Sequence, residues 1–355
     1  MFYTEAGQFS TRYAADRRVF RLRQDRFALA LLLVFAAGVV PLIGNDYWFN
    51  AILIPFLVLS LAGLGLNLLT GYAGQLSLGS AAFMAAGAFA AYNFQLRIEG
   101  LPLLISFGLG GLVAALLSVV FGLPSLRIKG FYLIVSTLAA QFLIPWVLVK
   151  YGWFSNHNAS GVISAPPLQV IGADLSTPVG RYLLTLGVVV ALTWLAKNIV
   201  RSELGRNWMA VRDMDTAAAV IGISLPKAKL LAFALSGFYL GIAGSLWAFA
   251  YLGTVEPHGF DLSRSFQVLF IIIIGGLGSL LGNFLGAAFI VLFPLFLSNL
   301  VGLLPPGLID AGQLENVQKM IFGALIIAFL IREPEGLARI WQKFRARARR
   351  WPLRY

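Results

Sequence analysis

The feature that most constrains this chain is a set of long runs without a single charged residue. One of them extends from Tyr47 to Leu96, and because a helix needs about 20 apolar residues to cross the hydrocarbon core, it has room for two crossings. Of all residues, 59% are hydrophobic and only 12% are charged. So few charges could not cover a soluble fold without exposing large apolar patches. The composition predicts an all-α integral membrane protein and excludes a soluble enzyme.

The charge-free runs together predict about ten transmembrane helices. They are Phe27–Gly44, Tyr47–Leu96 (two crossings), Leu101–Leu126, Gly130–Val149, Tyr182–Ala196, Leu230–Val255, Ser265–Ile309 (two crossings) and a last span that ends with Met320–Ile331. Glycine-rich stretches could instead be re-entrant, which would change the number by one. The predicted organisation is a basic extension at residues 1–26, a transmembrane domain at 27–331 and a basic tail at 332–355.

The basic residues predict the orientation of these helices. If the N-terminus is inside and the spans alternate, 22 of the 27 Lys and Arg residues fall on the inside. Cytoplasmic segments of membrane proteins carry this excess, so both termini are predicted to be cytoplasmic. The same rule explains the net charge of +12 without a nucleic-acid partner. The basic tail fits either an anchor on anionic lipid or a topology signal alone.

Several kinds of chemistry find no support in the sequence. The charge-free runs hold no ionisable carboxylate or amine, which argues against proton coupling, although Na⁺ could still bind backbone carbonyls. No G-x-x-x-x-G-K-[ST] phosphate loop is present, so the chain is not expected to hydrolyse ATP itself. The two histidines, His157 and His258, lie in predicted outer loops without ligand-spaced partners. We therefore predict no catalytic residue, no metal site and no cofactor bound by this chain. An ion-coupled secondary transporter remains an alternative.

Polar residues and glycines gather in two of the membrane runs. Helices rich in glycine can be interrupted, so that their free backbone groups face a cavity. The same composition equally fits tight helix packing with no substrate contact. The short spacing Gly71-x-x-Gly74 recurs as Gly275-x-x-Gly278, which could reflect an internal repeat. The candidate translocation path consists of Asn67, Thr70, Gln75, Ser77, Gly275, Gly276 and Gly278.

Two connecting loops are longer than ordinary connectors. The outer one, at about 151–180, is rich in turn-forming residues and fits an exposed segment that faces a partner or substrate. The inner one spans about 201–229. Within it, Trp208, Val211 and Val220 alternate with charged residues and predict a short amphipathic helix over Asn207–Val220 that ends near Gly222.

This inner loop and the helix after it resemble the permeases of branched-chain amino-acid ABC importers. The similar stretches are Ser202–Arg206, Ala210–Asp213, Ala217-Ala218, Gly222-Ile223, Lys229–Phe233, Ser236-Gly237 and Gly241–Gly244, with further matches at Asn67–Gly87 and Ile274–Ala287. Through the 26 residues before Phe27, the chain looks like the longer permease of a pair.

The resemblance implies a ten-helix fold of the type II kind shared with vitamin B12-type importers, in the bacterial inner membrane. It also implies a second homologous permease, two cytoplasmic ATPases that bind ATP, and an extracytoplasmic substrate-binding protein. The inner loop would be the segment that couples to an ATPase, through Glu203, Gly205, Arg206, Arg212, Asp213, Asp215 and Gly222. The expected substrates are branched-chain or related amino acids. Urea, short amides and aromatic acids are alternatives within the family, because specificity resides mostly in the separate binding protein.

Overall fold

The computed structural model describes residues 23–126, 131–158, 162–166, 168–170, 173–302 and 336–349, with short helical pieces between residues 316 and 331. Helix dominates these residues, which confirms the all-helical prediction. The predictions for residues 1–22, for most of the last transmembrane span and for the end of the basic tail lie outside the described residues.

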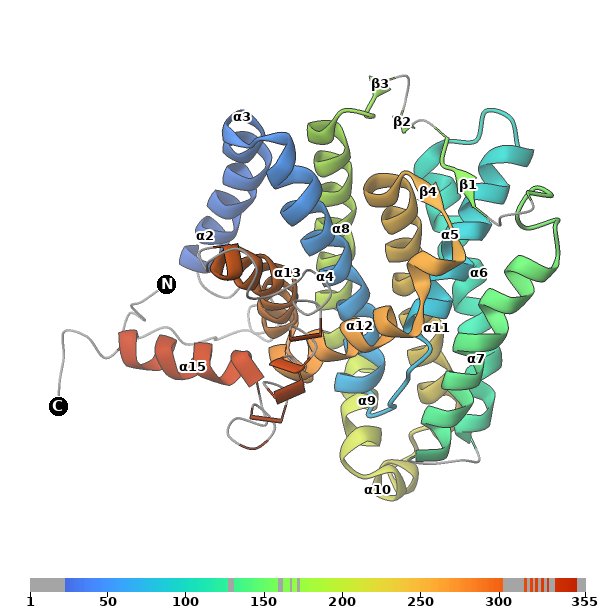
Figure 1. Cartoon of the computed structure of the whole chain (residues 1–355). Helices are drawn as coiled ribbons and strands as arrows, with labels where there is room; N and C mark the ends of the chain where they lie inside the picture. Colours follow the sequence, from blue (N-terminus) through green and yellow to red (C-terminus); the bar gives the residue numbers. More distant parts are fainter. Residues whose placement is uncertain are drawn as a thin grey trace.

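The helices carry the labels of Figure 1. Along the chain they are α2 (Arg23–Val34), α3 (Val40–Ile43), α4 (Ile54–Asn67), α5 (Ser80–Arg97), α6 (Leu103–Gly122), α7 (Phe131–Lys150), α8 (Pro178–Arg201), α9 (Glu203–Asp213), α10 (Asp215–Val220), α11 (Leu225–Leu246), α12 (Leu262–Gly275), α13 (Leu280–Gly302) and α15 (Gly336–Arg349). Short π-helical or 3₁₀ segments join or extend them: η1 (Phe35–Val39), η2 (Trp48–Leu53), η3 (Leu68–Tyr72), η4 (Leu123–Leu126), η5 (Trp247–Leu252) and η6 (Pro257–Phe260).

Six helices of the described part are long and apolar enough to cross a membrane. They are Trp48–Tyr72, Leu103–Gly122, Tyr132–Lys150, Pro178–Arg201, Leu225–Leu252 and Leu280–Asn299. A shorter apolar helix covers Phe27–Ile43. The integral membrane fold is confirmed, whereas the number of ten spans stays a prediction. The run predicted at Tyr182–Ala196 is longer in the structure because charged and polar residues at both ends also adopt helix.

The two long loops lie at opposite ends of the helical body (Figure 1). Helices α9 and α10 lie at the bottom of the view and the four short strands at the top. Strand β1 (Ile163–Ser164) pairs antiparallel with β4 (Thr254–Val255), so the two loops that contain these strands are joined. Strands β2 (Gln169–Val170) and β3 (Ala173–Asp174) form a second pair. Loops at opposite ends agree with spans that alternate in direction across the membrane. That α9 and α10 lie on the cytoplasmic side stays a prediction.

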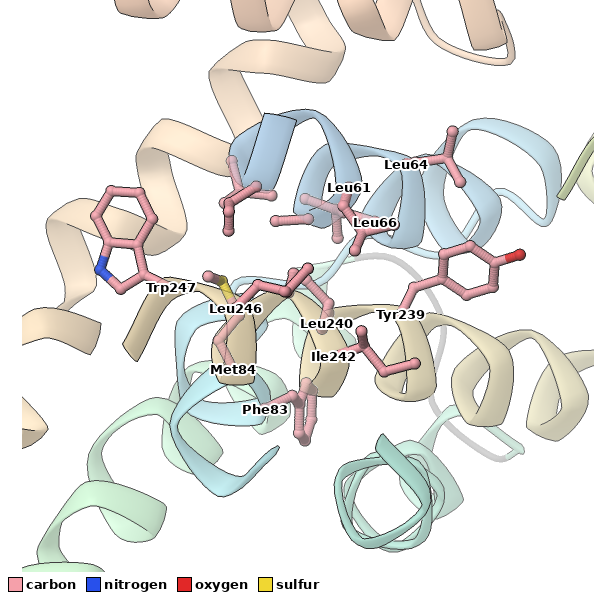
Figure 2. Close-up of a cluster of buried hydrophobic side chains, with 14 of the residues drawn as sticks. Leu61, Leu64, Leu66, Phe83, Met84, Tyr239, Leu240, Ile242, Leu246 and Trp247 are labelled. Carbon is pink, nitrogen blue, oxygen red and sulfur yellow. The ribbon is translucent and has the colours of Figure 1, made fainter. Parts of the chain in front are cut away.

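Helix α11 is the centre of the packing, in contact with α4, α5 and α6. Figure 2 shows leucines of α4 on one side of it and Phe83 and Met84 of α5 on the other. The approach of α5 is so close that a Cβ on Gly244 would lie 1.9 Å from the Met84 carbonyl oxygen. Small residues permit such contacts between helices in a membrane, where burial from water supplies no driving force.

Candidate functional site

Helix α9 of the inner loop is anchored on the membrane helices through its apolar face. The Trp208 side chain is 1% exposed, and its Nε1 donates a hydrogen bond to the Ala228 carbonyl oxygen at 2.9 Å. Val211 is also buried, and Gly205 lies against the Val200 backbone. The prediction that Trp208 and Val211 lie on a buried face is therefore confirmed. The hydrogen bond joins α9 to the start of α11.

The predicted single helix over Asn207–Val220 is wrong in two respects. Helix begins earlier, at Glu203, and breaks at Met214, whose φ and ψ of −158° and 99° are extended. Asp215 in the first turn of α10 favours a new helix start, because a carboxylate is stabilised near the positive end of the helix dipole. Val220 does not share the buried face, since its side chain is 87% exposed. Gly222 has a positive φ of 91° and ends the turn after α10, as expected.

The side chain of Arg212 connects the inner loop to the membrane helices. Its Nη1 donates to the Gly71 carbonyl oxygen at 2.9 Å, and its Nη2 lies 2.9 Å from an Asp213 carboxylate oxygen. The stem of Arg212 packs on Gly74, where φ is +70° and a Cβ would lie 2.8 Å from the Arg212 Cγ. Glycine is favoured there by both the backbone conformation and the close contact. Arg212 thus links the loop to the end of the span Trp48–Tyr72.

Asn67 joins the two glycine-rich segments at the same place. Its Oδ1 accepts from the Gly278 N–H at 2.9 Å, and its Nδ2 donates to the Ser279 carbonyl at 3.0 Å. A Cβ on Gly71 would lie 2.4 Å from the Gly278 nitrogen. The structure therefore brings together residues predicted for the coupling loop and residues predicted for the path. We call Asn67, Gly71, Gly74, Arg212 and Gly278 the coupling junction.

The non-helical segment 73–79 that follows is held by side chains. Thr70 Oγ1 donates to the Gln75 carbonyl at 3.0 Å, and the Leu78 N–H donates to Thr137 Oγ1 at 3.0 Å. Irregular backbone at membrane depth needs such partners. Thr70, Gln75 and Ser77 are all buried within the chain, so their predicted role in a path stays a prediction. Their position supports tight packing in this conformation.

The residues that cap the start of α5 were not predicted from the sequence. Gln141 Oε1 accepts from the Ala82 N–H and Ser265 Oγ accepts from the Ala81 N–H, both at 2.9 Å. Ser265 also donates to Gln141 at 2.8 Å. These are single polar residues in otherwise apolar runs, which is the only signal that could have indicated them.

The remaining loop residues lie at the surface or the edge of the loop. Glu203 and Arg206 are exposed, Asp213 is exposed, and Asp215 is half-buried. Gly275 and Gly276 are buried beside the α12–α13 connection. Among the residues with described coordinates, no three His, Cys, Asp or Glu side chains are grouped in a way that could hold a metal ion.

Replacing Asn67 with alanine is expected to destabilise the protein by about 2–4 kcal/mol, because the Gly278 N–H and the Ser279 carbonyl lose their buried partner. Thermal unfolding of the purified protein measures the change. Ser60→Ala is the matched control on the same helix, since Ser60 is equally buried and its hydroxyl donates to the Phe56 carbonyl one turn away. Equal unfolding midpoints for the two variants would contradict the role of Asn67.

Comparison with known proteins identifies the family. Residues 49–330 match the family described as the branched-chain amino acid transport system permease component. The chain belongs to this family. It is thus a permease component and a multi-pass protein of the bacterial inner membrane, as the resemblance predicted.

Two relatives carry the same transport description. The high-affinity branched-chain amino acid permease LivM of Salmonella typhimurium is 28% identical over 89% of this chain and 75% of the relative, and LivM of Escherichia coli K12 is 27% identical over the same shares. The ribose import permease RbsC of Escherichia coli K12 also matches, at 25% identity over 91% of this chain and 98% of the relative. No solved structure matches the chain significantly.

Proposed function

We propose that this permease is the longer subunit of a pair in an ATP-driven importer that moves branched-chain or related amino acids inward. Membership of the family implies an ATPase and a substrate-binding protein as partners. Our proposal adds a second homologous permease, two ATPases that bind the ATP, a ten-helix type II fold and cytoplasmic termini. In this assignment the permease itself catalyses no reaction and binds no cofactor.

The observation that carries the mechanism is the hydrogen bond from Arg212 to the Gly71 carbonyl. Closure of the ATPases on ATP would move α9 and α10. Because Arg212 holds Gly71 and Asn67 holds the α12–α13 connection, this motion reaches two membrane segments at once. The coupling junction would thereby switch the permease between outward-facing and inward-facing states.

The exposed side chains at the tip of the inner loop support an ATPase as the partner that binds this loop. Met214, Val220 and Ile221 are 62%, 87% and 73% exposed and lie next to charged residues of the loop. Apolar side chains that protrude from a charged segment are typical of a docking surface. The tip fits a groove on a cytoplasmic partner, whereas Trp208 fixes the other face of the loop to the permease.

The substrate assignment rests on the two LivM relatives. The match to RbsC, whose name gives ribose as the substrate, is the specific observation for a sugar instead. Urea, short amides and aromatic acids remain the alternatives that the resemblance itself implies.

Reconstitution of the importer tests the proposal. The tagged permease is expected to co-purify with a second permease and ATPase subunits. In proteoliposomes with the binding protein, we expect leucine uptake that requires ATP and is unchanged by ionophores. Uptake that collapses with the ion gradient would favour a secondary transporter. Uptake of ribose, urea or benzoate in place of leucine would refute the amino-acid assignment.

A further inference from the structure

A half-buried cation lies at the predicted outer end of the packing, away from the coupling junction. Arg264 is in the first turn of α12, and its guanidinium carbon lies 4.1 Å from the centroid of the Trp247 ring. Its Nη1 donates to the Gln267 side-chain oxygen. Asp261 caps the helix through the Arg264 backbone N–H at 2.9 Å. The aromatic ring and the amide hold the guanidinium in place, and the nearby Asp261 carboxylate stabilises its charge, although no ion pair joins these two described residues.

Two N–H donors at this cluster have no acceptor. Arg264 Nε and Trp247 Nε1 are both buried and form no hydrogen bond. Arg264 also forms no ion pair with a carboxylate of the residues that the structure describes. An unpaired charge and unmade hydrogen bonds are both costly in a membrane protein, where an ionisable group usually marks a functional site. Each of these two N–H groups lacks a hydrogen-bond acceptor, such as an oxygen atom.

The backbone around Trp247 is irregular as well. The end of this span is π-helical over Trp247–Leu252, and Gly253 follows with a φ of +70°. Single π-helical turns occur often at functional sites. Tyr251 packs against Trp247 with ring centroids 4.4 Å apart and ring planes tilted by 45°, and its side chain is 36% exposed. Figure 2 shows the Trp247 indole turned away from the leucines of the central cluster.

We propose that Arg264 and Trp247 bind the carboxylate of the substrate after its release from the binding protein. A guanidinium and an indole N–H are the donors that a carboxylate accepts, and Tyr251 offers an apolar surface for the rest of the molecule. A neutral sugar would leave the cation unpaired. The inference rests on the proposed function, since it requires an importer whose substrate is an acid and an extracytoplasmic position for Arg264.

The test compares Arg264→Gln with Arg97→Gln in the reconstituted importer. Arg97 is a matched control because it also stacks on a tryptophan, with its guanidinium carbon 3.8 Å from the Trp153 ring centroid. Its Nε donates to Asn93 Oδ1 and its Nη2 donates to the Trp153 carbonyl, whereas the Nε of Arg264 has no acceptor. For Arg264→Gln we expect leucine uptake to fall about tenfold or more, with assembly and substrate-free ATPase activity unchanged. Arg97→Gln is expected to keep uptake within about twofold.

Conservative variants separate a binding role from a structural one. Arg264→Lys keeps the charge and should recover part of the uptake, and Trp247→Phe keeps the ring but should raise the KM for leucine-loaded binding protein. The preference for leucine over leucinamide should also fall in Arg264→Gln relative to the wild-type complex.

Each outcome bears on one of the two proposals. If the wild type imports leucine and Arg264→Gln behaves like Arg97→Gln, the carboxylate site is wrong and the importer assignment stands. If the wild type imports an aromatic acid and Arg264→Gln loses it, the site stands and the branched-chain assignment is wrong. Ribose uptake overturns both. Loss of assembly in both Arg264→Gln and Arg264→Lys overturns the site, because the guanidinium would then pair with a partner protein.

Discussion

Replacing Gly244 with alanine is expected to abolish most folded permease. The added Cβ would lie 1.9 Å from the carbonyl oxygen of Met84, and 2.4 and 2.6 Å from its carbonyl carbon and Cα. All three are backbone atoms of α5, so no rotamer change can relieve the overlap. Helices α5 and α11 would have to separate, which breaks the cluster of Figure 2. We expect a loss of about 3 kcal/mol or more, measured as the yield of monodisperse protein after detergent extraction.

Gly108→Ala is the control for this prediction. Gly108 lies inside helix α6, and no atom lies within 4 Å of the position that its Cβ would occupy. Alanine is favoured over glycine in a helix interior by about 1 kcal/mol, so this variant should be extracted at least as well as the wild type. Equal yields for the two variants would show that α5 and α11 do not approach as closely as described.

Replacing Arg212 with glutamine is expected to uncouple ATP hydrolysis from transport. Glutamine cannot reach the Gly71 carbonyl while maintaining the packing of the stem on Gly74. We expect substrate-stimulated ATPase activity and uptake to fall about tenfold to a hundredfold, since a coupling free energy of about 1–3 kcal/mol is lost. The complex should still assemble, because Trp208 continues to anchor α9. Stimulation by loaded binding protein in proteoliposomes measures the effect.

Arg206→Gln provides the comparison on the same helix. Its guanidinium is exposed and donates only to the Arg201 carbonyl at 3.2 Å, within the loop itself. This variant loses the same charge without touching the coupling junction and should keep stimulation within about twofold. If both variants lose stimulation equally, the charge of the loop matters and the contact with Gly71 does not.

The parts of the site that followed from the sequence are those with a local signal. Trp208 and Val211 repeat at helical spacing, and the structure confirms their buried face. Val220 follows the same pattern, but the break at Met214 removes it from that face. A pattern that assumes one continuous helix cannot detect such a break. For Gln141 and Ser265 the sequence showed only single polar residues in apolar runs, and their roles as caps arise only where α7, α12 and the start of α5 meet.

The sequence by itself was sufficient to show that this is a membrane protein and to indicate its family. Long runs without charge require a membrane wherever they fold, because the transfer of each helix into lipid depends on its own residues. Only the tertiary structure placed Arg212 on Gly71, 141 residues away, and Asn67 on Gly278, 211 residues away. It also placed Arg264 beside Trp247 with donors unmet. Such contacts depend on which helices pack together, and that depends on the fit of side chains between distant segments.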